Sequence, residues 1–538
     1  MKKTWILLPL LLAIALSAGI YIGADMSRFG AEAPVFNRMV NHSSNKITQI
    51  INFIERHYVD TVDKAGLIDF SIQEMLQHLD PHSYYISARE LRQYTEPLEG
   101  NFDGIGVEFT IQNDTVFVVT PLEGGPSEAL GIRSGDRIVT VDGENIAGIG
   151  VTNRDVMTSL RGESGTRVNV QIKRRGTPGL LDFTITRGKI PIYSVAVSYM
   201  LDDATGYIRV TRFAKTTHQE FMEGVMNLKM NGMEQLIIDL RGNGGGYLNT
   251  AIAMIEELLP ANQLIVYTEG RAQPRKTYET RRSGSLTNLP VVIMIDQGSA
   301  SASEILAGAV QDNDRGLIVG RRSFGKGLVQ EHYEFPDSSA IRLTVSRYYT
   351  PSGRSIQRPY GNGIDYEADI YARYETGELY DSTKINYPDS LVYFTRSGRK
   401  VFGGGGIVPD LYVAIDTVGG SEYFTELSYR GILNDFAFEY ADSHRDRLLA
   451  AGSVEEFVKS FVVNPRMLQD LYHFADGRGL KADPTDINIS ESHIALHLKA
   501  LIARNIWGND GYYPIIAEDD RMLQVARGAF EKGKTILP

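Results

Sequence analysis

The chain has 538 residues, 43% of them hydrophobic, so it is long enough for several domains with buried cores. Its formal net charge of −11 argues against nucleic acid as the main partner. It has no cysteine, which excludes disulfides, thiolate catalysis, zinc ribbons and acylation at an N-terminal cysteine.

An apolar run of 19 residues, Trp5 to Gly23, follows two lysines at the start of the chain. This length lies between the about 7–15 residues of a signal-peptide core and the roughly 20 of a spanning helix. We expect residues 1–23 to be a membrane anchor in preference to a removed signal peptide, and the sequence does not decide whether they are cleaved. Either segment would export the rest of the chain to the periplasmic side of a bacterial envelope, anchored in the first case to the inner membrane.

Residues 24–95 are expected to form an N-terminal helical region. The segments "ITQIINFIERHY" and "DKAGLIDFSIQEMLQHLD" repeat apolar residues at helical spacing, and "DPHS" interrupts the second one. This pattern indicates a small packed unit.

Short alternating strands and turns follow from about Gly100, over a segment that we bound at 96–187. The segments "GIGVEF", "SEALGIRSGDRIVTVDGENI" and a helix that begins near Asn153 resemble a PDZ domain. The resemblance implies that a peptide adds as a strand and places its last side chain in an apolar pocket, while backbone N–H groups of one turn bind its terminal carboxylate. That turn consists of Gly104, Ile105, Gly106 and Val107. A PDZ-shaped module that only packs or gates is the alternative.

An α/β core with a partly parallel sheet is predicted over 188–358 and 403–415, because strand and helix patterns alternate there. The tyrosine-rich segment 359–402 is interpreted as an insertion, since a further core strand follows it. Residues 416–538 are predicted to be a helical C-terminal domain. The sequence does not say whether these two additions build an oligomer interface, shape a substrate tunnel or dock an adaptor.

A small-residue segment, "GSASASEI" at 298–305, lies between a strand pattern and a helix pattern. The N-terminus of a helix leaves backbone N–H groups unpaired and partly positive. A serine there can attack a carbonyl while those groups stabilise the oxyanion, and small neighbours leave room for a substrate. The alternative is structural, because Ser301 and Glu304 also fit a capping box.

A nucleophilic serine needs a base, and the histidines form no partner pattern with it. Lys326, set between glycines in "RRSFGKGLVQ", can serve if burial lowers its pKa. Its segment, Gly320 to Gly327, lacks the final Ser or Thr of a P-loop and precedes a strand pattern. "GNGGGY" likewise misses the dinucleotide fingerprint. We therefore expect no metal, nucleotide or other cofactor.

The segment "GSASASEILAGAVQDNDRGLIVGRRSFGKGLVQ" resembles the core signature of the carboxyl-terminal processing peptidases, the tail-specific serine proteases of family S41. Further segments match in the same order over 45–358 and 403–413, including "LDPHSYYIS", "LIIDLRGNGGGYL", "YYTPSGRSIQ" and "GIVPDLYV". The resemblance implies a multidomain α/β protein, with a ClpP/crotonase-like protease core, an inserted PDZ domain, an N-terminal helical unit and a helical C-terminal extension.

By that resemblance Ser301 is the nucleophile and Lys326 its base. Gln330 matches the residue that orients the lysine, and Asp312 matches an acid that some members add to the set. In an extended strand the Cα atoms of Lys326 and Gln330 would be roughly 13 Å apart, so their contact requires a bend.

The resemblance also assigns the oxyanion hole to the N–H groups of Gly245 and Ala302. Ser299 and Ser303 receive no role, and Glu304 is interpreted as a helix cap.

These inferences predict an exported serine endopeptidase whose PDZ domain takes polypeptide substrates with free apolar C-termini. The C-terminal helices are candidates for a homo-oligomer or adaptor interface. The alternative is a catalytically silent PDZ scaffold of the cell envelope. The natural substrates, the activating event and the oligomer size are not indicated by the sequence.

Overall fold

The computed structural model describes residues 44–537 apart from 123, 362–363, 367, 386–388 and 451. Residues 1–23, which we expect to be an anchor or signal peptide, lie outside the described residues. In the described part, no helix has the length and apolar composition needed to cross a membrane. The chain divides into two compact units, Met1–Ser87 and Ala88–Pro538.

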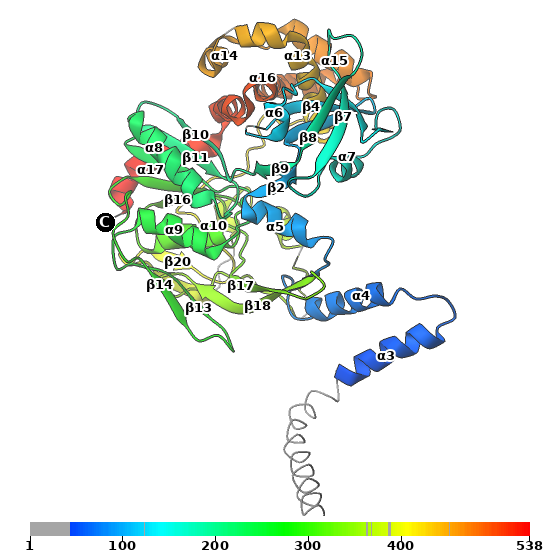
Figure 1. Ribbon diagram of the computed structural model, residues 1–538. Coiled ribbons are helices and arrows are strands. Elements are labelled where there is room, and N and C mark those ends of the chain that lie inside the picture. Colours follow the sequence, from blue (N-terminus) through cyan, green and yellow to red (C-terminus); the bar gives the residue numbers. More distant parts are fainter. Residues whose placement is uncertain are drawn as a thin grey trace, which may run out of the picture. The chain divides into compact units, whose positions relative to one another are not determined.

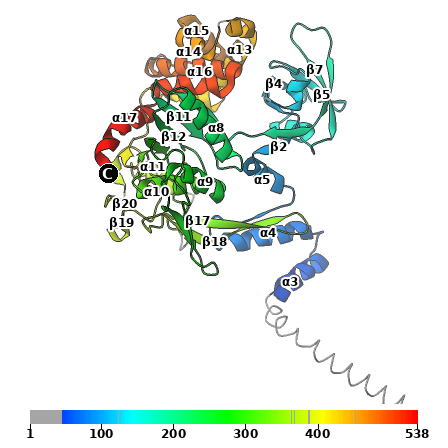
Figure 2. The same ribbon diagram turned by 60° about the vertical axis from the view of Figure 1, so that its left-hand side comes forward.

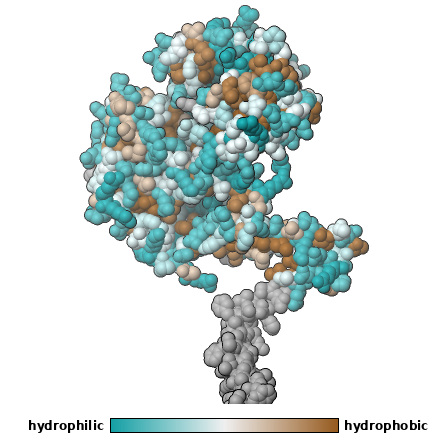
Figure 3. Space-filling model, in the orientation of Figure 1, coloured by the Kyte–Doolittle hydropathy of each residue, from teal (hydrophilic) through white to brown (hydrophobic). Residues whose placement is uncertain are grey.

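The first unit contains the predicted helices α3 (Ser44–His57) and α4 (Lys64–Gln77) and the short strand β1 (Tyr84–Ile86). Asp63 caps α4, because its carboxylate accepts a hydrogen bond from the Gly66 N–H at 3.1 Å. Several large apolar side chains of this unit are exposed, and Figure 3 shows hydrophobic residues on its surface.

A six-stranded sheet forms the centre of the second unit, in the order β10-β11-β12-β15-β16-β21. All neighbouring pairs are parallel except β10 with β11. The strands are β10 (Val195–Met200), β11 (Thr205–Val210), β12 (Gln235–Asp239), β15 (Val291–Ile295), β16 (Leu317–Gly320) and β21 (Leu411–Tyr412). The return of the chain to this sheet at β21 agrees with the core strand predicted after residue 402.

Helices cover both faces of the sheet (Figures 1 and 2). Ile208, Ile238 and Ile293 pack on one face with α8 (Thr217–Met230), α9 (Leu248–Leu258) and α10 (Ala302–Asp312). Their neighbours Tyr207, Ile237 and Val292 pack on the other face with α17 (Arg521–Ile536). Burial on both faces explains why β15 reads as an uninterrupted apolar run.

Antiparallel strands form a second layer beside this core. β18 (Ala340–Tyr349) pairs with β13 (Leu264–Glu269) and with β17 (Leu328–Glu334), and β13 also pairs with β14 (Lys276–Glu279). The 359–402 segment contains a short helix, α11 (Asp369–Glu375), and a hairpin of β19 (Val392–Phe394) and β20 (Lys400–Phe402).

The PDZ domain is a sheet in the order β3-β4-β5-β7-β8 with the helix α7 (Asn153–Leu160). Its strands are β3 (Val107–Gln112), β4 (Thr115–Pro121), β5 (Arg137–Val141), β7 (Arg167–Lys173) and β8 (Leu181–Thr186). The chain enters and leaves the domain through an antiparallel pair, β2 (Asn101–Gly104) and β9 (Gly188–Pro191), which α5 (Leu91–Glu99) precedes.

The C-terminal part is helical as predicted, but the helices over 416–538 do not all pack into one core. Five helices share an apolar core of their own: α12 (Glu422–Tyr429), α13 (Ile432–Ala450), α14 (Val454–Ser460), α15 (Pro465–Asp476) and α16 (Pro484–Ile516). The last helix, α17, instead buries its apolar face against the central sheet. The amphipathic pattern predicts each helix but does not identify the surface that buries it.

Candidate active site

Ser301 occupies the turn between β15 and α10, where the central sheet meets its best-buried helix. Its backbone has φ 54° and ψ −112°, a conformation that non-glycine residues rarely adopt. Such strain costs about 1–3 kcal/mol and persists only where neighbouring contacts hold it. The turn places the serine at the N-terminal end of α10, as the sequence indicates.

The two neighbouring serines supply those contacts. The Ser299 hydroxyl donates to the Leu240 carbonyl at 2.8 Å, and the Ser303 hydroxyl donates to the Asn243 carbonyl, also at 2.8 Å. Both side chains are fully buried. They therefore tie the loop that carries Ser301 to the loop that follows β12, a structural role that no pattern in the sequence revealed.

Gly245 lies directly against Ser301. Its φ is +101°, and a Cβ there would lie 2.8 Å from both the Ser301 Cβ and the Ala300 carbonyl oxygen, so only glycine fits. Its N–H donates to the Asn243 Oδ1 at 2.9 Å. The predicted oxyanion donor is thus beside Ser301 but is hydrogen-bonded internally. Ala302 is the first residue of α10, where a backbone N–H has no acceptor within the helix.

Lys326 and Gln330 meet as the resemblance requires. The Lys326 Nζ donates to the Gln330 Oε1 at 2.9 Å. Lys326 precedes β17, which begins at Leu328, and the register of this strand shifts between Val329 and Gln330. The irregularity provides the bend that a regular strand would lack.

Glu304 binds the segments of both catalytic candidates. Its carboxylate accepts hydrogen bonds from the N–H groups of Ser301 at 2.8 Å, Lys326 at 2.9 Å and Gly325 at 2.7 Å, and from the Ser323 hydroxyl at 2.5 Å. The side chain is fully buried, and burial raises its pKa to about 7 although these hydrogen bonds lower it. Glu304 therefore does more than cap α10, because it joins the nucleophile turn to the lysine loop.

Tyr348 makes a second connection between the same two segments. Its hydroxyl lies 2.5 Å from the Lys326 carbonyl oxygen and 3.2 Å from that of Ser301. The ring is buried, and burial raises the pKa of this hydroxyl well above 10, so it remains a donor. Glu304 therefore binds the backbone N–H groups of Ser301 and Lys326, and Tyr348 binds their carbonyl oxygens.

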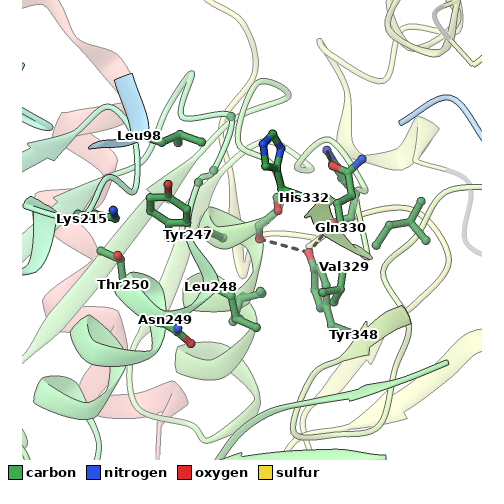
Figure 4. A pocket seen from close by; sticks show the side chains of 18 of the residues that line it. Leu98, Lys215, Tyr247, Leu248, Asn249, Thr250, Val329, Gln330, His332 and Tyr348 are labelled. Atoms are coloured by element: carbon green, nitrogen blue, oxygen red, sulfur yellow. Dashed lines mark hydrogen bonds between the residues drawn. The ribbon is translucent and has the colours of Figure 1, made fainter. Parts of the chain in front are cut away.

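Ser301 and Lys326 line one cavity of about 940 Å³. Leu248, Ile305 and Leu328 give it apolar walls, and Lys215 and Arg342 add positive charge. Figure 4 shows side chains of α9 and its preceding loop on one side and those of β17 and β18 on the other. A cavity of this size can accept a stretch of extended polypeptide with an apolar side chain.

Asp312 is not brought to this cavity. It ends α10, eleven residues after Ser301, which is about 16 Å along a helix axis. Its carboxylate pairs with Arg354 at 2.7 Å, with both side chains fully buried, and accepts a hydrogen bond from the Ser352 hydroxyl. The geometry gives Asp312 a structural role in place of the catalytic one that the resemblance suggested.

The PDZ turn has the geometry expected of a peptide site. Gly104 ends β2, Ile105 is buried, Gly106 has φ +76°, and Val107 begins β3. β3 is an edge strand: among the described residues it pairs only with β4. Its free edge leaves backbone groups to which an extended peptide can add.

In the described ranges, no group of three or more His, Asp or Glu side chains is arranged to hold a metal ion.

Several family models match the sequence. Peptidase family S41 matches residues 204–370, the PDZ domain matches 104–185, and the activating protease CtpB N-terminal domain matches 23–89. Residues 423–508, which run from α12 into α16, match a family of unknown function, DUF8443.

The chain is also similar to individual proteins. It is 34% identical to the carboxy-terminal-processing protease of Bartonella bacilliformis, over 69% of this chain and 85% of that protein. It is 33% identical to the carboxy-terminal processing protease CtpB of Bacillus subtilis, over 58% of this chain and 65% of that protein. Among solved structures it resembles the photosystem II D1 C-terminal processing protease, at 27% identity and a TM-score of 0.35, over 68% of this chain and 92% of that one. The 34% identity to the Bartonella bacilliformis protease over 85% of its length, together with the S41 family model, shows that the chain belongs to the carboxy-terminal-processing proteases of peptidase family S41.

Proposed function

We propose that this protein is a serine endopeptidase in which Ser301 is the nucleophile and Lys326 the general base. The observation that carries the proposal is that one buried carboxylate, Glu304, binds the backbone N–H of both residues beside a shared cavity. A serine on a strained turn at the start of a helix, in one cavity with a lysine that an amide holds, is an arrangement suited to acyl transfer.

In this mechanism the neutral Lys326 amine accepts the proton of the Ser301 hydroxyl as the oxygen attacks the scissile carbonyl carbon. The N–H groups of Ala302 and Gly245 stabilise the oxyanion, and Gly245 must first release the Asn243 side chain. The C–N bond then breaks, and the departing amine takes the proton from Lys326. Water hydrolyses the acyl-enzyme by the same steps.

We propose further that the PDZ domain selects polypeptides with a free apolar C-terminus. The terminal carboxylate would bind the N–H groups of the turn at 104–107, and the peptide would extend β3. Substrates that differ only in a free or an amidated C-terminus test this step. Slower cleavage of the amidated form is expected, and equal rates would remove the PDZ domain from substrate selection.

For its place in the cell we propose the periplasmic side of the envelope, with residues 1–23 as the link to the inner membrane. The C-terminal helices are proposed to form a homo-oligomer or to dock an adaptor. Cell fractionation of the full chain and of a chain that lacks residues 1–23 tests the first point. Loss of membrane association without the segment is the expected result.

The decisive experiment compares four full-length chains: the parent, Ser301→Ala, Lys326→Ala and Lys532→Ala. Lys532 is exposed and far along the sequence from the cavity residues, so its variant controls for the loss of a lysine. Each receives an unfolded protein that ends in apolar residues, and mass spectrometry follows the fragments. Cleavage by the parent and Lys532→Ala alone supports the Ser/Lys mechanism.

Activity that survives in Ser301→Ala would refute the assignment of the nucleophile. If none of the four chains cleaves the substrate but all bind its tail, the result would favour the silent scaffold.

A further inference from the structure

A second cavity, of about 380 Å³, lies at the carboxyl ends of the central strands. We call it the arginine pocket, because three arginines line it. They are Arg209 near the end of β11, Arg241 after β12 and Arg321 after β16. Residues of the C-terminal segment, including Tyr513 and Asp520, line its other side. It shares no lining residue with the Ser301 cavity. Ligands of open α/β sheets bind at this edge of the sheet.

Two of the three guanidinium groups are neutralised by the protein. Asp239, which is fully buried, binds Arg209 and Arg241 at 2.7 Å each. Asp520 binds Arg241 at 2.6 Å. Two cations are thus matched by two anions, and these pairs hold the walls of the pocket in place.

Arg321 is matched only by neutral acceptors. Its Nε donates to the Gln297 Oε1 at 2.9 Å, and its Nη1 lies 3.4 Å from the Val413 carbonyl oxygen. It forms no ion pair with any residue that the structure describes. Asp296 is near enough to favour its charge, but burial outweighs this and lowers the pKa of Arg321. Asp296 also lines the pocket, so the charge of Arg321 has a nearby carboxylate but no direct ion-pair partner among the described residues. A bound oxyanion would supply that direct partner.

Two further donor atoms of residues that line the pocket have no hydrogen-bond partner among the described residues. The Tyr199 hydroxyl and the Arg209 Nε are buried, and neither forms a hydrogen bond with the described residues. An unpaired buried donor destabilises the fold. Tyr199 and Arg209 line the pocket, and a ligand that brings acceptor oxygens would satisfy these donors once the two side chains turn toward it.

We propose that the arginine pocket binds a small oxyanion, either a carboxylate or a phosphate group. Both present several acceptor oxygens to a guanidinium and can take two parallel N–H bonds from it. The volume is near the lower end of the about 300–1,000 Å³ range of ligand pockets, so the ligand is small. This site is separate from proteolysis and does not depend on the proposed mechanism.

The loops that line the pocket are those that carry the catalytic groups. Arg241 lies four residues before Gly245, and Asp296 lies five residues before Ser301. The Asp296 carboxylate also accepts the Gly242 N–H at 2.8 Å and so joins the two loops. A ligand in the arginine pocket would therefore contact the same two loops through residues that do not line the Ser301 cavity, and it would raise the stability of this part of the core.

The test measures binding of two probes, sodium phosphate and sodium acetate, to the full chain by calorimetry and by the thermal unfolding midpoint. Sodium chloride at equal ionic strength is the reference. The variants are Arg321→Gln, which removes the charge, and Tyr199→Phe, which removes only the hydroxyl. Arg271→Gln is the control, because Arg271 is exposed and outside the pocket.

We expect saturable binding of at least one anion by the parent and by Arg271→Gln. The dissociation constant should rise at least tenfold in Arg321→Gln and severalfold in Tyr199→Phe. Binding of phosphate alone or acetate alone would identify the ligand's acid group, and binding of both would indicate a general oxyanion site. No saturable binding by the parent, or equal binding by folded Arg321→Gln, would overturn the proposal.

Discussion

Ser301 and Lys326 are joined through a single atom: the Glu304 Oε2 accepts the backbone N–H of Ser301 at 2.8 Å and that of Lys326 at 2.9 Å. The distance between the proposed nucleophile and the proposed base is therefore set by backbone hydrogen bonds and does not need a contact between their side chains. A carboxylate in this position can be altered without touching either reactive group.

Glu304→Gln is expected to lower kcat about a hundredfold with little change in KM. The amide NH2 replaces an acceptor oxygen and faces N–H or O–H donors, so the two catalytic segments separate, while the apolar walls of the cavity are retained. Steady-state kinetics at pH 8 measure the effect. Glu334→Gln, at an exposed glutamate of β17, is the matched control. An unchanged kcat in Glu304→Gln would contradict the positioning role.

The same residue predicts a pH dependence of stability. Burial raises the Glu304 pKa to about 7, whereas an unfolded glutamate titrates near 4.5, so the folded chain binds this proton more tightly. Its contribution to the free energy of unfolding is therefore largest below pH 4.5, falls as the pH rises to about 7, and is then constant. The change is about 3 kcal/mol at most. Urea unfolding at pH 5 and pH 8 measures the free energy of unfolding. It should fall more between these two pH values in the parent than in Glu304→Gln. An equal fall in the two chains would argue against a raised pKa of Glu304.

Gly245 and Gly244 provide a matched pair. Gly245→Ala is expected to abolish cleavage and to destabilise the fold by about 1–3 kcal/mol, because its Cβ would meet Ser301 at 2.8 Å and its φ is +101°. A Cβ at Gly244 would meet nothing within 4 Å. Gly244→Ala should therefore keep both activity and stability. Equal losses in the two variants would show that the loop simply does not accept alanine.

Gln330→Glu tests the state of the lysine. A carboxylate 2.9 Å from the Lys326 Nζ favours the charged amine, so less of it is neutral at a given pH. The acidic limb of the kcat/KM profile should move up by about one pH unit or more. Gln330→Leu removes the acceptor without adding charge and should lower the rate without that upward shift. A profile that does not move in Gln330→Glu would mean that Lys326 is not the titrating base.

Asp312→Ala separates stability from catalysis. It leaves Arg354 buried and unpaired, which should cost about 3–5 kcal/mol of unfolding free energy. The kcat per folded molecule should stay within about threefold of the parent, because the carboxylate lies at the far end of α10 from Ser301. Urea titration gives the first quantity, and kinetics corrected for the folded fraction give the second. A large fall in kcat at unchanged stability would return Asp312 to the catalytic set.

Patterns local in the sequence predicted most of the architecture. The uninterrupted apolar run of β15, the period of α10 and the turns of the PDZ domain each identify an element from a few neighbouring residues. The surface against which α17 packs was not predictable from such local patterns. Its amphipathic face fits any apolar surface, and only the assembled sheet shows which surface it covers.

The sequence predicted only those residues of the candidate site that belong to the family motif. Ser301, Lys326 and Gln330 came from the family resemblance, and the structure brings Lys326 and Gln330 into contact. The roles of Ser299, Ser303 and Glu304 depend on partners 19 to 60 residues away in the sequence, so no spacing rule could reveal them. The buried ion pair of Asp312 with Arg354 was likewise not apparent from the order of residues along the chain.

The Asn243 side chain occupies one of the two proposed oxyanion donors, the N–H of Gly245, in this structure. Hydrogen bonds of Ser299 and Ser303 hold the turn that carries Ser301, whereas the N–H of Gly245 already has an acceptor in Asn243. One oxyanion donor is worth about 10²- to 10³-fold in rate. If Gly245 serves as that donor, the resting enzyme is latent by this factor, and its speed follows the fraction of molecules in which a single peptide group has turned toward the substrate. Activation would then require neither a new nucleophile nor a new base, only a change of partner for one amide.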